Sequence, residues 1–246
     1  MWPYYSKKCL STIRTMAPRT YLLALISLGV LCGCSSTSRI EPYKQTDAVL
    51  GEDERIVILP RRHHASHEAE ESFVDCVSDG LARGDEGLGV HISTAFEDRL
   101  YPWFEPSTAP LSIDDFSELM KNPNIHEQVR LSKVRFIVWL DGSTDRIASG
   151  GAISCAASPY GAGCMGLAWW EDDARYDATV WDVLNLSSAG TIYADYNGRS
   201  AMPALVIPIP LVVRPQALAC RGLTEQLKQF LTTPDGYEPG PELSAN

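Results

Sequence analysis

Val134-Arg-Phe-Ile-Val-Trp-Leu140 is a run of β-branched and aromatic residues that predicts a buried strand near the middle of the chain. A second apolar run, Arg55-Ile-Val-Ile-Leu-Pro60, predicts another short strand, which the proline ends. Within residues 163–198 we expect three antiparallel strands, with turns near 171–174 and 186–190. These runs predict a sheet, and the segments between them decide how it is covered.

Those segments carry the start signals and the apolar spacing of helices. Ser112 lies three residues before Asp115, the spacing of a capping box, and Pro123 suits the first turn of another helix. Further helices are expected after Ser66 and after Pro215. Their apolar stripes consist of Phe73, Cys76, Val77 and Leu81 in the first, and of Cys220, Leu223, Leu227 and Phe230 in the second.

Shorter elements are expected at 87–92, as a strand, and at 93–100, as a helix. Strands and helices alternate early in the chain, and a meander of strands follows. This order predicts an α+β (mixed α/β) single domain with a mixed, largely antiparallel sheet of about five to six strands and helices packed on it.

The charge of the chain excludes one class of partner. The 246 residues carry 31 acidic and 21 basic side chains, and four of the basic ones lie within the first 20 residues. Removing residues 1–33 therefore leaves a formal net charge of about −14. A body this acidic is repelled by phosphate backbones, so we expect no nucleic-acid partner.

The N-terminal segment has the features of an export signal. The apolar residues 21–32 would span about 18 Å as a helix, too short for a hydrocarbon core of about 30 Å. Basic residues precede this run and small residues follow it, which predicts a secretory signal peptide over 1–33. Met16 is an alternative start to Met1.

Leu31-Cys32-Gly33-Cys34 resembles the lipobox of bacterial lipoproteins. The resemblance implies that the thiol of Cys34 carries a diacylglyceryl group and that its amine receives a further fatty acid, such as palmitate. Two or more acyl chains anchor a protein stably in a membrane. Ser35 after the cysteine implies sorting to the outer membrane of a Gram-negative bacterium, facing the periplasm.

The rest of the chain divides into three parts by composition. Residues 34–54 are polar and without apolar periodicity, so we expect a flexible tether that reaches about 25 Å. Residues 55–232 are expected to form one globular periplasmic domain. The turn-rich residues 233–246 are expected to be a disordered tail.

Four cysteines remain in the expected globular domain: Cys76, Cys155, Cys164 and Cys220. In an exported domain they allow three pairings. If the helices that carry Cys76 and Cys220 cover one face of the sheet, those two pair, and Cys155 pairs with Cys164. The alternative is that Cys76 and Cys220 are free buried thiols. No C-x-x-C spacing supports a tetrathiolate zinc site.

His63, His64 and His67 are weak candidates for a metal site. Three imidazoles within five residues could bind Zn²⁺ or Cu²⁺. The adjacent pair points in different directions and no distant carboxylate is evident as a fourth ligand, so we expect a solvated loop and no cofactor. The alternative function for this chain, a small-ligand or metal-binding protein or an enzyme, depends on this loop.

Other motifs do not support catalysis. Residues 161–166 match G-x-G-x-x-G, but a strand-like Leu-Ala-Trp-Trp follows where a dinucleotide site needs a helix. Ser143 lies in a turn-like segment without a G-x-S-x-G elbow. Residues 171–173 are a possible calcium-binding turn. No catalytic residue is therefore predicted.

Two unusual segments predict contact surfaces. Leu100-Tyr-Pro-Trp-Phe-Glu-Pro106 places aromatics between prolines, and residues 204–213 are strongly apolar. The prolines at 208 and 210 restrict that second run to a sheet edge or an extended loop. Both segments could instead pack on their own core. The candidate partner-binding residues are Tyr101, Trp103, Phe104, Ile207 and Ile209.

Several segments together look like uncharacterised proteobacterial lipoproteins. They are Arg55 to Pro60, Phe96 to Pro106, Val134 to Val138, and Ala178-Thr-Val-Trp-Asp182. More distantly, the order of strands and helices is similar to the N-terminal domain of TolB and to the periplasmic domain of the secretion lipoprotein CsgG. The resemblance implies a mixed sheet with helices and a role in envelope assembly or binding, with no catalytic residues.

CsgG-like pores need long membrane hairpins, and we expect residues 163–198 to be too acidic and too broken by turns to form them. The sequence thus predicts a lipid-anchored, non-enzymatic envelope protein that binds another protein or itself.

Overall fold

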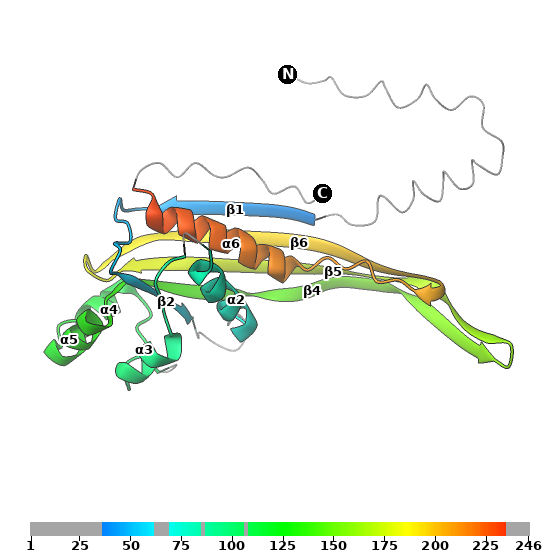
Figure 1. Ribbon diagram of the computed structural model, residues 1–246, viewed down its shortest axis with the longest axis horizontal. Coiled ribbons are helices and arrows are strands. Elements are labelled where there is room, and N and C mark those ends of the chain that lie inside the picture. Colours follow the sequence, from blue (N-terminus) through cyan, green and yellow to red (C-terminus); the bar gives the residue numbers. More distant parts are fainter. Residues whose placement is uncertain (1–35, 62–68, 85–86, 106–107, 235–246) are drawn as a thin grey trace, which may run out of the picture.

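The computed structural model describes residues 36–61, 69–84, 87–105 and 108–234. One sheet of six strands has the order β1-β6-β5-β4-β2-β3. The strands are β1 (Ser36–Lys44), β2 (Arg55–Pro60), β3 (Val90–His91), β4 (Val134–Ser158), β5 (Gly161–Asp182) and β6 (Ser187–Pro208). The helices are α2 (Glu71–Ala82), α3 (Ser93–Arg99), α4 (Ile113–Leu119), α5 (Pro123–Ser132) and α6 (Pro215–Thr232). Figure 1 shows that the helices gather at one end of the long strands.

The sheet is mixed, because β2 is parallel to both β3 and β4 and every other pair is antiparallel. This confirms the predicted α+β single domain. The capping box at Ser112 is present, and Pro123 begins α5 as expected. The last helix begins at Pro215 and buries the predicted stripe.

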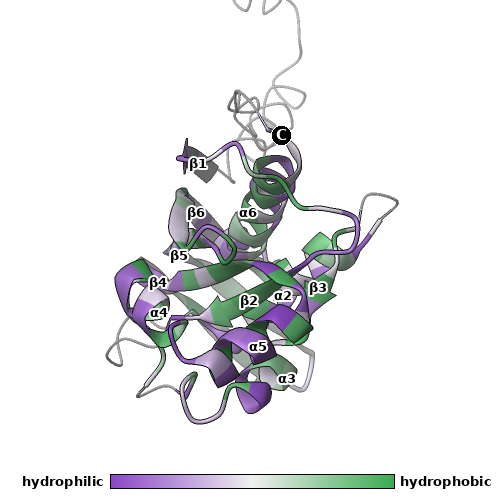
Figure 2. Cartoon of the chain, turned by 90° about the vertical axis from the view of Figure 1, so that its left-hand side faces the viewer, coloured by the Kyte–Doolittle hydropathy of each residue, from purple (hydrophilic) through white to green (hydrophobic). Residues whose placement is uncertain are grey.

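Two cores pack on opposite faces of the helix-covered end of the sheet. Phe136 and Val138 point to the face that α2 and α6 cover, whereas Ile137 and Trp139 point to the face covered by α3, α4 and α5. Successive side chains of a strand alternate between faces, so a strand buried on both sides is apolar throughout. Figure 2 shows the apolar β2 at the centre of this end.

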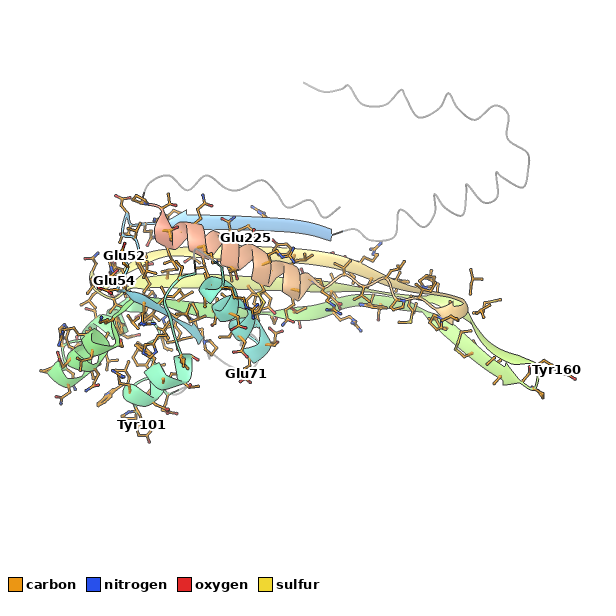
Figure 3. The ribbon with its side chains drawn as sticks, in the orientation of Figure 1. Glu52, Glu54, Glu71, Tyr101, Tyr160 and Glu225 are labelled. Atoms are coloured by element: carbon orange, nitrogen blue, oxygen red, sulfur yellow. A yellow bond between two sulfur atoms is a disulfide. The ribbon has the colours of Figure 1, made fainter. Side chains whose placement is uncertain are left out.

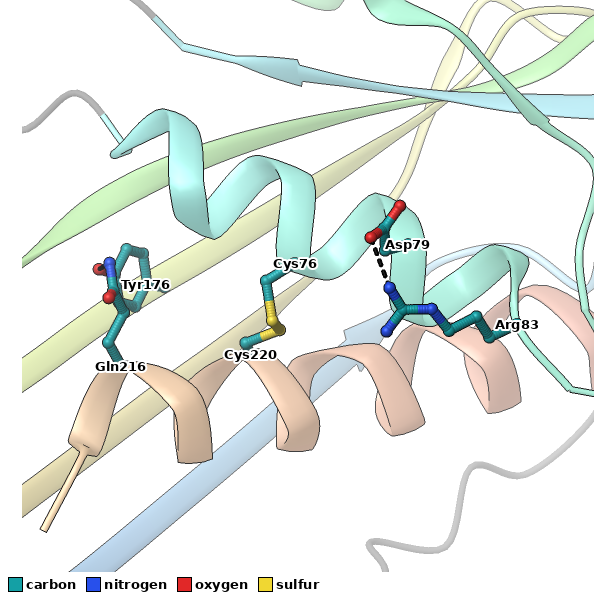
Figure 4. Close-up of a disulfide and its surroundings, with 6 residues drawn as sticks. All are labelled: Cys76, Asp79, Arg83, Tyr176, Gln216 and Cys220. Atoms are coloured by element: carbon teal, nitrogen blue, oxygen red, sulfur yellow. Dashed lines mark hydrogen bonds and ion pairs between the residues drawn. A yellow bond between two sulfur atoms is a disulfide. The ribbon is translucent and has the colours of Figure 1, made fainter.

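Both predicted disulfides are present. Cys76 of α2 bonds Cys220 of α6, with a Cα–Cα distance of 6.3 Å, and joins the two helices on one face (Figure 4). Cys155 and Cys164 lie directly opposite each other in β4 and β5, with a Cα–Cα distance of 4.0 Å. The first bond closes a loop of most of the domain, and the second closes a hairpin.

The predicted tether is wrong from residue 36 onward. Residues 36–44 form β1, which pairs with β6, and Ile40 packs against the core of α2 and α6. The N–H of Leu50 donates to the carbonyl of Leu231 at 2.8 Å. An edge strand needs only backbone partners, so a polar segment can fill the place beside β6. The predicted lipobox and residues 235–246 of the expected tail lie outside the described residues.

The predicted meander is also wrong in its first turn, because residues 171–174 lie within a strand. Residues 161–182 form a single strand, so 163–198 hold most of β5 and the first part of β6 where three strands were expected. The β5–β6 turn lies at 183–186, just before the expected position. The acidic residues 171–173 stay extended because arginines neutralise them across or along the strands. The pairs are Glu171–Arg199 and Asp172–Arg146, both at 2.9 Å, and Asp173–Arg175 at 2.5 Å.

Helix α2 begins later than expected, at Glu71. The preceding Glu70 does not bond the helix terminus with its side chain. Its carboxylate accepts hydrogen bonds from the Tyr176 hydroxyl at 2.5 Å and from the Thr144 N–H at 3.0 Å. Glu70 thus joins the entry to α2 to the middle of the sheet. Ser66, the expected cap, lies outside the described residues.

A buried ion pair closes the β5–β6 turn. Asp182 is fully buried and accepts from the guanidinium of Arg135, with one N–O distance of 2.9 Å. The backbone and side-chain amides of Asn185 also donate to it, at 2.8 and 2.9 Å. Burial alone would raise the pKa of Asp182, but these hydrogen bonds together hold the pKa below its ordinary value.

Replacing Asp182 with Asn should therefore destabilise the domain by about 3 kcal/mol, because Arg135 keeps its buried charge and loses its nearest counter-ion, with only Glu54 left at 3.6 Å. The lowered pKa of Asp182 means that its contribution is present above pH about 4 and is lost as the pH falls through the lowered value. Urea unfolding at pH 7 and pH 3 measures this. A penalty for Asp182→Asn that is as large at pH 3 as at pH 7 would contradict the assignment.

The two disulfides should differ in their effect on stability. Their sequence separations are 144 and 9 residues, so loop entropy assigns about 5 kcal/mol to Cys76–Cys220 and about 2.7 kcal/mol to Cys155–Cys164. Double Cys→Ala variants of each pair, compared by urea unfolding, test this. Equal losses of unfolding free energy in the two variants would show that loop length is not the source.

Candidate functional site

The most distinctive feature of the molecule is a part of the sheet that no described helix covers. The 25 residues of β4 span about 80 Å, whereas the 18 residues of α6 span about 27 Å. We call the uncovered part the arm, comprising residues 147–170 of β4 and β5 with their turn, and residues 200–208 of β6. Figure 1 shows it extending away from the helices.

The arm contains no charged residue. Neither the segment from Ile147 to Trp170 nor the segment 200–213 holds an Asp, Glu, Lys, Arg or His, although the segments 39–146 and 171–199 carry many charges. Glycine, alanine and serine are frequent in β4 and β5 here. The arm therefore has little side-chain bulk of its own with which to form a core.

Several of its large apolar side chains lie open to solvent together on one face. Met165 of β5 lies directly opposite Leu205 of β6, and Leu167 follows on the same face. Their exposed fractions are 72%, 81% and 52%. Ile207, two residues beyond Leu205, is also exposed. Adjacent exposed apolar side chains of this size mark contact surfaces in soluble proteins.

A pair of tryptophans marks the boundary between the arm and the charged body. Trp169 and Trp170 are adjacent in β5 and so point to opposite faces. The guanidinium of Arg199 lies 5.6 Å from the ring centre of Trp169, and that of Arg146 lies 5.4 Å from Trp170. Because both arginines also pair with the acidic residues that follow in β5, charge begins abruptly at this line.

The far end of the arm is a tight hairpin. The Cys155–Cys164 bond crosses it, and Tyr160 at the turn is almost fully exposed (Figure 3). The G-x-G-x-x-G match lies in this hairpin and continues as strand β5, without the helix that a dinucleotide site requires. Gly166 has φ +143°, and a Cβ there would lie 2.2 Å from the carbonyl oxygen of Ala152. This glycine allows the strands to approach.

One edge of the arm lacks a neighbouring strand within the described residues. β4 pairs with β2 only as far as Leu140 opposite Pro60. From residue 141 to Ser158, the outer edge of β4 therefore presents backbone N–H and C=O groups. The Thr144 N–H, which donates a hydrogen bond to the carboxylate of Glu70, lies at the start of this edge.

A pocket of about 560 Å³ lies between the arm and the covered end. Along β5, Asp173, Arg175 and Asp177 point to one face, which they share with Tyr193 and Asp195 of β6. The charged residues that line it are Arg39, Asp141, Asp145, Asp173, Arg175, Asp177 and Asp195. Acids outnumber bases, so the pocket favours cations over anions.

Burial and the nearby Asp141 raise the pKa of Asp177 to about 6, against a smaller opposing effect of Arg61. Burial also raises the pKa of Asp173. Acidic residues are therefore crowded here at some cost to stability. Within the described parts of the chain, no group of three or more His, Cys, Asp or Glu side chains is arranged to hold a metal ion.

The predicted partner-binding residues do not form one surface. Tyr101 and Trp103 are 65% and 38% exposed, beyond α3. Ile207 is exposed near the end of β6 in the arm, and Ile209 is exposed just after β6. Figure 3 shows Tyr101 and the arm residue Tyr160 at opposite ends of the molecule.

The prediction for Phe104 is wrong, because Phe104 is 3% exposed. Its ring packs against Phe96, Phe116 and Trp139 in the core that α3, α4 and α5 cover. An aromatic residue next to the exposed Trp103 can fill the hole between α3, α4 and the sheet, which the local sequence does not reveal.

His63, His64 and His67 lie outside the described residues. Ser143 is in β4 and its hydroxyl donates to Asp145 at 2.8 Å. The calcium interpretation of 171–173 is wrong, because these residues form a strand and pair with arginines. The signal for the arm was present in the sequence as the long interval without charge.

Comparison with known proteins places this chain in no family, because no family model and no curated protein matches it. Among solved structures, it is similar to a PelC dodecamer from Paraburkholderia phytofirmans at a TM-score of 0.33 and 12% identity, covering 80% of this chain and 99% of that chain. A single-residue variant of that dodecamer gives a TM-score of 0.35 and 13% identity, covering 80% and 98%. Among the described residues, no helix is long and apolar enough to cross a bilayer.

The raised pKa of Asp177 predicts a pH-dependent effect of Asp177→Asn. The folded state holds this proton more tightly than the unfolded state, so the native carboxyl loses stability as the pH rises from about 4 to about 6. The variant should therefore raise Tm relative to wild type at pH 7.5 and not at pH 4. Asp98→Asn, at an exposed position in α3, is the control. A variant that lowers Tm at pH 7.5 would contradict the prediction.

Proposed function

We propose that this chain is a lipid-anchored protein of the Gram-negative envelope, held at the outer membrane with its domain in the periplasm. It acts as a binding or assembly module without catalysis. Fatty acids on Cys34 are its anchor, and the exposed apolar face of the arm is its main contact surface. The observation that carries the proposal is that β1, the strand that follows Cys34 in the sequence, begins beside the arm.

Cys34 precedes the first residue of β1, Ser36, by two positions. Ser36 lies opposite Gly198 in β6, and the uncharged segment of β6 begins at Ser200. Two residues span at most about 7 Å. Acyl chains on Cys34 would therefore be attached close to the line where the charged body ends and the arm begins.

Two further observations support a binding role in an oxidising compartment. Both disulfides are of the kind that persists outside the cytosol. Met165, Leu205 and Ile207 expose apolar area that contributes nothing to the two cores. A surface of this kind stabilises a protein only when something covers it.

Expression of the full-length chain in a Gram-negative host tests the anchor. Wild type should incorporate labelled palmitate and yield an N-terminal peptide that begins with a modified Cys34. Cys34→Ser should abolish the label, because serine cannot form the thioether. Cys32→Ser, two residues away, is the matched control and should retain it. A label unaffected by Cys34→Ser, or an unmodified Cys34 with its leader attached, would refute the proposal.

A further inference from the structure

We infer that the arm binds the lipid surface, with the face that carries Met165, Leu167 and Leu205 against the acyl chains and with Trp169, on that same face, at the level of the headgroups. The inference rests on the proposed function, because the anchor on Cys34 brings the arm to the membrane. It identifies the partner of the arm as lipid.

The distribution of charge singles out the arm. The body is strongly acidic and is repelled by anionic headgroups. The arm carries no charge over 147–170 or 200–213, so it can approach lipid without that repulsion and without burying an ion. Within the described residues, the arm is the region where a lack of charge coincides with large exposed apolar side chains.

The boundary residues have the composition of a membrane interface. Tryptophan is favoured at the headgroup level, because its ring is apolar and its indole N–H is polar. Trp169 and Trp170 lie where the charge-free segment ends. Arg199 and Arg146 stack on their rings, with guanidinium groups on the side of the charged body. Arginine at this level can also meet lipid phosphates.

The start of β1 and this boundary lie at the same level of the sheet. In the strand register, Ser36 is opposite Gly198, and Gly198 is opposite Asp172, two residues from Trp170. Acyl chains attached two residues before Ser36 would enter the lipid beside the tryptophans. The arm and the anchor therefore can contact one bilayer surface together.

The free edge of β4 limits how deeply the arm can lie. Between residue 141 and Ser158, its outward backbone groups have no strand partner among the described residues. The hydrocarbon core cannot satisfy such groups, whereas water and headgroups can. The arm should therefore lie within the interfacial region, with one apolar face buried and its edge hydrated.

A second copy of the chain is the competing occupant, because open edges and exposed apolar strands also pair with each other. The uncharged composition and the neighbouring lipobox favour lipid. The following experiment distinguishes the two.

Full-length wild-type protein is reconstituted into vesicles of phosphatidylethanolamine and phosphatidylglycerol that carry brominated acyl chains, which quench tryptophan fluorescence on contact. We expect quenching in wild type and its loss in Trp169→Phe/Trp170→Phe. Trp103→Phe, at the opposite end of the molecule, should leave the quenched fraction unchanged. Quenching that survives Trp169→Phe/Trp170→Phe would overturn the inference.

Introducing charged side chains on the apolar face of the arm tests whether that face contacts the acyl chains. Met165→Asp/Leu205→Asp should reduce the quenching at least twofold, because carboxylates hold the arm away from the acyl chains. Ile92→Asp/Leu184→Asp is the matched control, at exposed apolar positions of the body, and should not change it. Equal effects of the two double variants would contradict an arm-specific contact.

Sedimentation of the same proteins in detergent provides the second readout. If the arm variants convert an oligomer into a monomer without changing the quenching, the arm binds a second copy and the inference is wrong. The mass of the Cys34 peptide is measured separately. Unlipidated wild type with arm-dependent quenching would refute only the anchor, and lipidated wild type with unquenched arm tryptophans would refute only the arm contact.

Discussion

The continuous hydrogen-bonded ladder of β4, β5 and β6 is the constraint on which the other features depend, since each of these strands has at least 22 residues. Helices rise less than half as far per residue as strands do, so helices of ordinary length cannot cover such a ladder. Two cores therefore form at one end, where α2 and α6 cover one face and α3, α4 and α5 cover the other. The remaining length becomes an arm, whose surface has to be covered by water, lipid or protein.

Charged residues are frequent where helices cover this ladder, and they disappear where the helices end. At the covered end, the buried Asp182 is neutralised by Arg135, and a group of aspartates lines a pocket farther along. Past Trp169 and Trp170, the strands carry no charge at all. An acidic body with an uncharged extension has one region that tolerates a low-dielectric surrounding. That asymmetry connects the proposed lipid anchor to the arm, because both would lie on the same side of the charged body.

Local patterns predicted the elements whose stability is local. The capping box at Ser112, the start of α5 at Pro123 and the apolar stripe of α6 were correct because side chains a few residues apart satisfy the helix termini or face one core. The disulfides were also predicted, from the face that two stripes share. The length of β5 was missed, because acids at 171–173 suggest a turn until Arg199 and Arg146 approach from neighbouring strands. Phe104 was assigned to the surface because the rings that bury it, on α3, α4 and β4, come from separate parts of the sequence.

The amino-acid sequence by itself determined the helix starts at Ser112, Pro123 and Pro215, the class of the fold and the absence of charge in the arm, since each depends on residue types near one another in the chain. Only the tertiary structure decided that polar residues 36–44 form a strand, that β4 continues to Ser158, and that the uncharged segments of three strands gather in one arm. The physical reason is that backbone hydrogen bonds between strands depend little on side-chain type. Pairing with a neighbouring strand can therefore hold a segment in the β conformation, even when the segment is rich in glycine and alanine or is polar and has no strong preference for that conformation.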